Sequence, residues 1–149
     1  MRIIGLVRMT VALSVGSAVF GPARATAQGG GTSATIEKPK ALTVSTGHCL
    51  KRADGTFGAV FGPDALPPLA FTIGPGSAMA DAMHASKAPF TGPGQYKNVI
   101  VMLYLGKTAT QDSYGGLGNV TVDADAKSGS FTLNDGTASG RWRCGSVAS

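Results

Sequence analysis

Groups that enzymes use for acid–base chemistry are scarce in this chain of 149 residues, which has two histidines and a single glutamate. A hydrolytic triad requires a nucleophile, a histidine base and an acid that converge in space, and the chain has no Gly-x-Ser-x-Gly sequence. His48 directly precedes Cys49, and neither His48 nor His84 has a partner at metal-ligand spacing. We therefore predict no catalytic histidine and no zinc site.

The carboxylates of the chain also do not follow the pattern of a retaining or inverting glycosidase, which needs two carboxylates in one cleft. The one glutamate, Glu37, lies near the start of the chain, and the aspartates mostly adjoin glycine or stand in turns. Asp123 and Asp125 would share one face of a strand, but Lys127 occupies a ligand position of a calcium loop. The sequence therefore predicts no catalytic residue, no metal site and no cofactor.

Cysteine is limited to Cys49 and Cys144, and no Cys-x-x-Cys spacing supports redox catalysis or a zinc site. In an oxidising compartment an isolated pair most simply forms a disulfide. We predict a Cys49–Cys144 disulfide that ties the start of the mature domain to its last strand.

A hydrophobic run long enough to span a membrane is missing, since the charge-free run Met9–Phe20 covers only 12 residues. Two arginines precede this run and two overlapping small-x-small sites, ending at Ala25 and Ala27, follow it, which is the order of an export signal. The sequence predicts a signal peptide over residues 1–27, cleaved at Ala25 or Ala27, and a secreted or extracytoplasmic product. No cysteine directly follows the run, so we expect neither a lipid anchor nor a membrane span after cleavage.

A basic cluster of the kind that binds nucleic acid is also missing. The chain has 13 Lys and Arg against 8 Asp and Glu, but Arg2, Arg8 and Arg24 lie in the predicted signal, so its removal lowers the excess from five to two. The remaining charges are scattered along the chain. Nucleic acid is therefore not an expected partner.

What the chain does contain is a series of short segments in which apolar and polar residues alternate, separated by turns. Residues 28–40 are predicted to be a flexible leader, and 41–149 a single β domain. One short helix is expected over 77–87, with Ser77 as its N-cap. We expect an antiparallel β-sandwich or flattened barrel of about seven strands, over 42–49, 56–61, 69–73, 96–105, 119–124, 130–133 and 138–144.

Alternation also predicts which side chains meet in the core. In the hairpin turning at Asn134-Asp135-Gly136, Trp142 and Cys144 share one face, and Arg141 and Arg143 take the other. The predicted core consists of Val44, Phe57, Phe71, Val99, Val101, Leu103, Val120, Val122, Phe131, Leu133 and Trp142.

Four segments of the C-terminal half combine glycine-containing turns with short strands: FTGPGQY (90–96), GNVTV (118–122), SGSF (128–131) and ASGRWRCG (138–145). This combination resembles small secreted single-disulfide β-domain proteins of the actinobacterial type and, more distantly, mycobacterial cell-wall lipoprotein antigens. The resemblance implies an exported β domain, and it implies no activity and no site residues. The chain departs from the lipoprotein antigens in lacking a lipidation cysteine.

Because catalytic groups are scarce and strands are many, the leading hypothesis is an exported, non-enzymatic binding or surface-interaction module. Its partner would be an extracellular protein or glycan, and the chain is expected to be a monomer. The predicted binding residues are Arg141, Arg143 and Tyr114. Tyr96 and Tyr104 are further candidates for a sugar-binding platform, but their place in or beside the long central strand favours core packing.

Two alternative functions remain open. A small secreted hydrolase would use His84 or an aspartate within 62–94, and it requires a histidine within hydrogen-bond reach of an acid. A secreted protein inhibitor would act through an exposed loop over 106–118, which must protrude and be rigid. The binding module predicts instead an exposed apolar or aromatic patch.

Overall fold

The computed structural model describes residues 31–77 and 79–149, and these residues form one antiparallel sheet of nine strands without a helix. The strand order across the sheet is β2-β1-β9-β8-β7-β6-β5-β4-β3. The predicted mainly β fold is confirmed, with nine strands in place of about seven. The strands are β1 (Ser33–Lys38), β2 (Leu42–Val44), β3 (Gly47–Lys51), β4 (Phe57–Phe61), β5 (Leu69–Ile73), β6 (Gly94–Tyr104), β7 (Ser113–Val122), β8 (Ser128–Leu133) and β9 (Ser139–Arg143).

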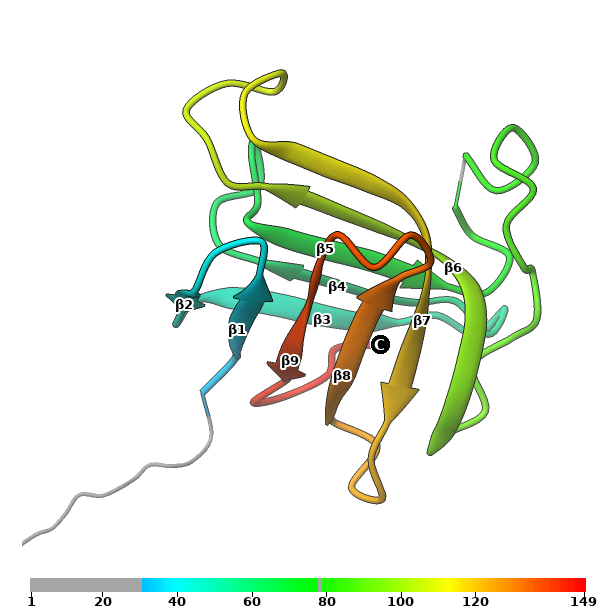
Figure 1. The fold of residues 1–149 in the computed structure, drawn as a ribbon. Helices are drawn as coiled ribbons and strands as arrows, with labels where there is room; N and C mark the ends of the chain where they lie inside the picture. Colours follow the sequence, from blue (N-terminus) through cyan, green and yellow to red (C-terminus); the bar gives the residue numbers. More distant parts are fainter. Residues whose placement is uncertain (1–30, 78) are drawn as a thin grey trace, which may run out of the picture. The chain divides into compact units, whose positions relative to one another are not determined.

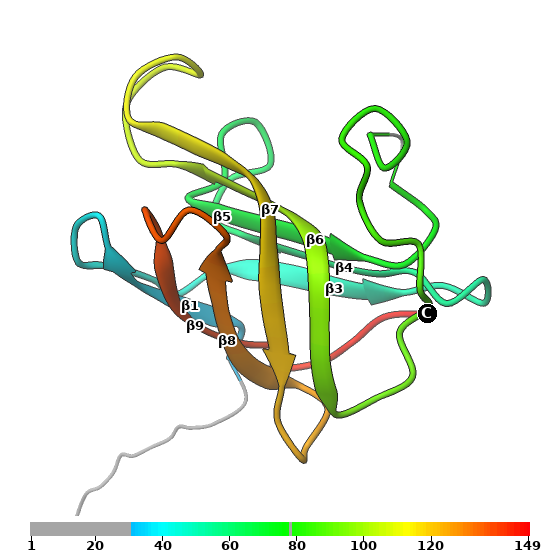
Figure 2. The ribbon, with the colours of Figure 1, turned by 45° about the vertical axis from the view of Figure 1, so that its right-hand side comes forward.

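The two longest strands, β6 and β7, bend the sheet so that it curls around its own core (Figures 1 and 2). Their pairing shifts register between Tyr96 and Val99, and Asn98 within this shift has a φ of 56°. A bulge of this kind bends a strand and increases its twist. On one side of the bend β5 pairs with residues 100–102 of β6, and on the other β8 pairs with residues 118–122 of β7. The result is a half-barrel made from one sheet.

The two end strands of the sheet, β2 and β3, follow each other in the chain. The segment after β9 lies beside β3. Ala148 donates its N–H to the carbonyl of Cys49 at 3.0 Å and accepts the N–H of Lys51 at 2.8 Å. Gly145 donates its N–H to Thr32 Oγ1 at 3.0 Å. Cys49 of β3 is bonded to Cys144, which confirms the predicted disulfide.

The core lies inside the curled sheet. In most strands every second side chain points into it, as alternation requires. Ten of the eleven predicted core residues are buried, and Val44 is partly buried against them. The alternation in β1 and around β4 and β5 adds further buried side chains, including Ile36, Phe61, Leu69 and Ile73.

The N-terminal boundary of the domain differs from the prediction of a flexible leader over 28–40. Residues 33–38 form β1, which pairs with both β2 and β9 and buries Ala34 and Ile36. The predicted strand over 42–49 is also divided into β2 and β3. Gly47, at the start of β3, has a φ of 148°, and a Cβ there would collide with the carbonyl oxygen of Val60. These two differences account for the additional strands.

The predicted helix over 77–87 is wrong. Ala78 lies outside the described residues, and the segment forms turns over 79–84, with one i→i−4 bond, from Met83 N–H to the Met79 carbonyl. His84 then takes a φ of 56°, its N–H bonds to the Asp81 carbonyl, and the N–H of Ala85 bonds to the Ala80 carbonyl. These bonds form a Schellman motif, which ends a helix, so a single turn is terminated as soon as it forms.

The predicted signal peptide, residues 1–27, lies outside the residues that the structure describes. Within the described ranges, no helix has the length and apolar character that crossing a bilayer requires.

Candidate functional site

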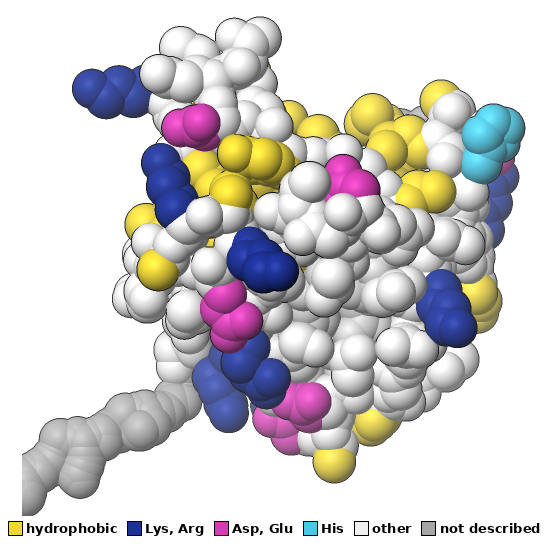
Figure 3. Space-filling view, viewed as in Figure 1, with side chains coloured by type: hydrophobic (Ala, Val, Ile, Leu, Met, Phe, Trp, Pro, Cys, Tyr) yellow, Lys and Arg dark blue, Asp and Glu magenta, His cyan; other side chains and the backbone are white. Residues whose placement is uncertain are grey.

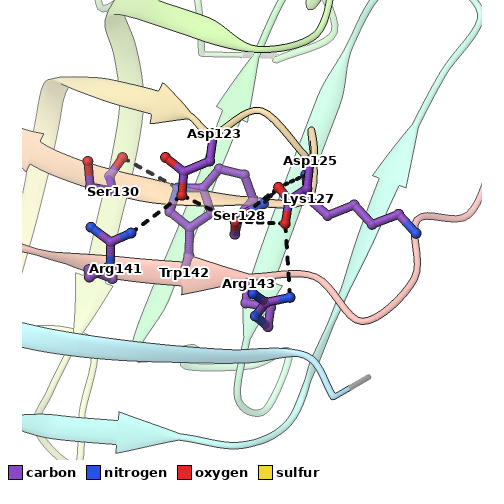
Figure 4. A network of polar contacts seen from close by, with 8 residues as sticks. All are labelled: Asp123, Asp125, Lys127, Ser128, Ser130, Arg141, Trp142 and Arg143. Atoms are coloured by element: carbon purple, nitrogen blue, oxygen red, sulfur yellow. Dashed lines mark hydrogen bonds and ion pairs between the residues drawn. The ribbon is translucent and has the colours of Figure 1, made fainter. Parts of the chain in front are cut away.

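Arg141 and Arg143 lie on the outer face of β9, and Trp142 between them points into the core (Figure 4). The register places Arg141 between Ser130 of β8 and Thr35 of β1. The predicted alternation in this strand is therefore confirmed. It brings both guanidinium groups to one solvent-facing surface of the sheet.

The turn between β7 and β8 presents two carboxylates to these arginines. Asp125 Oδ1 accepts the N–H groups of Lys127 at 2.9 Å and Ser128 at 3.0 Å. The Ser128 hydroxyl lies 3.0 Å from both carboxylate oxygens of Asp125 and 3.2 Å from Asp123 Oδ2. Ala126 supplies the left-handed turn residue, with a φ of 61°. Short Asx-type bonds thus fix Asp125 within the turn, and the Ser128 hydroxyl links it to Asp123.

Each arginine faces one of these carboxylates (Figure 4). Arg141 Nη2 lies 3.4 Å from Asp123 Oδ2, and Arg143 Nη1 lies 4.0 Å from Asp125 Oδ2. All four side chains are well exposed, and exposed ion pairs contribute at most about 1 kcal/mol to stability. The pairs therefore orient the guanidinium groups more than they hold the fold together.

A shallow depression of about 340 Å³ is lined by three of these charged side chains, Asp123, Arg141 and Arg143. We call this surface the Arg face, and define it as Ser33, Thr35, Glu37, Asp123, Asp125, Ser128, Arg141 and Arg143. In Figure 3, positive and negative side chains lie next to one another over the region of β1, β9 and β8. The Arg face combines donors and acceptors of both charges around one hollow.

The structure brings Arg141 and Arg143 together but places the third predicted binding residue elsewhere. Tyr114 lies in the first half of β7, opposite Leu103 of β6, and is partly buried against the core. The part of the Arg face that comes from β1 was missed, because residues 28–40 were predicted to be a flexible leader. The sequence pattern that could have predicted this strand is the alternation of polar Ser33, Thr35 and Glu37 with apolar Ala34 and Ile36.

The histidines lie away from the Arg face. His48 Nδ1 is 3.7 Å from Asp64 Oδ1, beyond hydrogen-bond distance, and these side chains are 60% and 82% exposed. His84 is exposed in the turn that follows β5. In the part of the chain that is described, no three His, Cys, Asp or Glu side chains are grouped as a metal site would need. The residues named for a hydrolase are thus not brought into catalytic contact with an acid.

The Asp125 carboxyl provides a test of this turn's geometry. The N–H of Lys127 lowers the pKa of Asp125 below its ordinary value of 3.8, with Ser128 and Arg143 adding to the effect. A carboxyl with a lowered folded-state pKa stabilises the fold above its unfolded pKa, and this contribution is lost as the pH falls through the folded value. Asp125→Asn is therefore expected to lower the urea midpoint at pH 7 and to match the wild type at a pH well below 3.8. Equal midpoints at pH 7 would contradict this role.

Comparisons of the chain with protein-family models, curated proteins and solved structures found no match.

Proposed function

We propose that this protein is an exported binding module that contacts an extracellular protein or glycan through the Arg face. The observation that supports this function most directly is the pair of guanidinium groups, each held beside a fixed carboxylate at the edge of a depression. Arginine is enriched among the residues that dominate binding energy. Guanidinium groups that are already oriented lose less side-chain entropy when a partner binds.

The exposed apolar or aromatic patch expected of a binding module is not seen in the described residues, so the proposed contact is polar. The large hydrophobic side chains exposed in the described residues are Leu42, 36% exposed in β2, and Met79, 50% exposed in the loop after β5. These two residues come from separate segments, whereas the Arg face is continuous across β1, β9 and the β7–β8 turn. Export, which the proposal includes, rests on the signal-like segment at residues 1–27.

The proposed contact can be tested with purified, fluorescently labelled protein and intact cells of the strain that produces it. Arg141→Gln with Arg143→Gln is expected to weaken saturable binding about tenfold or more, as loss of two central arginines does in known interfaces. The matched control, Lys51→Gln with Arg52→Gln, removes the same charge from β3 and the residue after it. Equal loss in both variants would indicate non-specific attraction, and no loss in either would contradict the proposal.

A second candidate function, a protein inhibitor, is favoured by the loop between β6 and β7. This loop projects beyond the sheet (Figures 1 and 2), and it is shorter than the predicted 106–118 because residues from Ser113 onward belong to β7. Leu105 donates its N–H to the Asp112 carbonyl at 3.0 Å, and Lys107 donates its N–H to Gln111 Oε1 at 3.1 Å. Lys40 Nζ braces the base, 3.5 Å from Asp112.

The same binding experiment separates the two candidates. Replacing residues 107–111 by glycine and serine removes the loop's side chains and leaves the Arg face unchanged. The inhibitor function predicts lost binding for the loop variant and normal binding for the arginine variant. The Arg-face function predicts the reverse.

A further inference from the structure

A second depression, of about 460 Å³, lies on another part of the sheet, where β6 separates from β5. The pairing of β5 with β6 covers residues 100–102 only, so the start of β6 extends beyond β5. The segment around 86–91 passes beside this free part of β6, and the N–H of Ser86 bonds to the Asn98 carbonyl at 2.9 Å. A volume of this size falls in the range of small-molecule sites.

The aromatic side chain in this depression, Tyr96, is the outermost ring of a column that starts in the core. Trp142 and Phe57 have ring centroids 6.0 Å apart, Phe57 stacks on Phe90 at 4.6 Å, and Phe90 stacks on Tyr96 at 5.7 Å. Phe90 thus supports one side of the Tyr96 ring, while Tyr96 lines the depression and is only partly buried. The ring is held where a ligand can pack against it.

The Tyr96 hydroxyl is also fixed, by two hydrogen bonds. It donates to the Gly92 carbonyl at 2.6 Å and accepts the N–H of Thr91 at 3.0 Å. Two hydrogen bonds at one end and stacking on Phe90 fix the side chain before any ligand arrives. Pre-organisation of this kind raises affinity because less freedom is lost on binding.

Polar residues line other parts of the depression. Gln95, Lys97 and Asn98 line the same depression and are exposed. Asn98 sits in the bulge, and its Oδ1 accepts a hydrogen bond from Asn134 Nδ2 at 3.2 Å. This bond connects the bulge to the turn after β8. A fixed aromatic ring flanked by amide and ammonium donors can bind a ligand that has both an apolar face and several hydroxyl groups.

We propose that this depression is a saccharide-binding subsite that takes one pyranose ring. The C–H face of the sugar packs on Tyr96, and its hydroxyl groups bond to Gln95, Lys97 and Asn98. This inference goes beyond the proposed function, because it uses a different surface and a different contact chemistry from the Arg face. The two can fail separately, since no residue belongs to both sites.

The subsite is tested by two-dimensional NMR of the ¹⁵N-labelled protein, titrated with the methyl glycosides of glucose, galactose, mannose and N-acetylglucosamine at tens of millimolar. At least one glycoside is expected to shift the amide signals of Thr91, Lys97 and Asn98. Tyr96→Ala is expected to weaken that binding about tenfold, as expected for loss of an aromatic contact. Tyr104→Ala, at the far end of β6, is the matched control and is expected to bind normally.

Lys97→Ala with Gln95→Ala provides a variant that leaves the aromatic column intact, in case Tyr96→Ala does not fold. This variant is also expected to weaken binding, because it removes hydroxyl partners without disturbing the ring. Absence of shifts with all four glycosides, shifts confined to other parts of the sheet, or unchanged binding by the folded variants would each overturn the proposal. Loss of cell binding by the Arg141 and Arg143 variant has no bearing on this result.

Discussion

Replacement of both Cys49 and Cys144 by serine is expected to lower the free energy of unfolding by about 4–5 kcal/mol. The disulfide joins residues 95 positions apart, and closing a chain loop of this length removes much of the entropy of the unfolded state. The bond also joins β3 to the segment that follows β9. Beside it, the segment after β9 is joined to β3 by the two backbone bonds of Ala148.

The double substitution is compared with the wild-type protein in urea and thermal unfolding, with and without reductant. Reduction of the wild type is expected to reproduce the loss, which separates loss of the covalent bond from any effect of the serine hydroxyls. A stability loss near 5 kcal/mol is comparable to the whole stability of many small domains. An unchanged midpoint in the double variant would show that the bond does not stabilise the native sheet.

Features that depend on neighbouring residues or on residue counts were predictable from the sequence. Two cysteines that follow a predicted export signal predicted the disulfide, and alternation predicted that Val99, Val101 and Leu103 face the core. The hairpin at Asn134-Asp135-Gly136 follows from turn residues that tolerate a positive φ, and Gly136 has a φ of 75°. Each of these inferences depends on a local rule that the rest of the fold does not override.

Features that depend on distant pairing were not predictable. β1 forms because Ala34 and Ile36 lie in a segment that pairs with β9, more than a hundred residues later in the chain. The bend of β6 depends on a two-residue bulge at Lys97 and Asn98, and a single sequence contains no clear sign of such a register shift. The helix prediction failed because propensity favours a helix over 77–87 while His84 adopts the left-handed conformation that ends one.

The candidate sites also combine features that local sequence determines with features that depend on distant pairing. The two arginines of the Arg face were predictable because they alternate with Trp142 in one strand. Their neighbours Ser33, Thr35 and Glu37 depend on β1, and so they could not be assigned to the site before that strand was known. Tyr96 was a candidate from its residue type, but its role as the outer ring of a column depends on Phe90, which comes from a long loop.

Trp142→Ala is expected to destabilise the fold by about 3–5 kcal/mol, the usual cost of truncating a buried tryptophan. The side chain is 2% exposed, and its ring lies 5.2 Å from Phe71 and 6.0 Å from Phe57, centroid to centroid. Its Nε1–H donates to the Ser130 carbonyl at 3.3 Å. Removing the ring thus leaves a cavity among aromatic side chains and an acceptor without its partner.

The position opposite Trp142 on β8 shows how closely the ring is packed. Gly129 pairs with Trp142, and a Cβ at Gly129 would lie 3.0 Å from Trp142 Cζ2 and would collide with the Thr121 carbonyl oxygen. The surrounding backbone therefore has little freedom to close over a missing ring, so the cost should fall toward the upper end of the range.

The neighbouring Arg141→Ala and Arg143→Ala substitutions are the matched controls, and each is expected to change stability by less than about 1 kcal/mol. Chemical denaturation of the three single variants measures the contrast between adjacent positions of one strand. A large loss at Trp142 with small losses on both sides shows that β9 supports the fold with one face and leaves the other free for binding. Comparable losses at all three positions would mean that the arginines are part of the fold's stability, and the reason for assigning them to a binding surface would disappear.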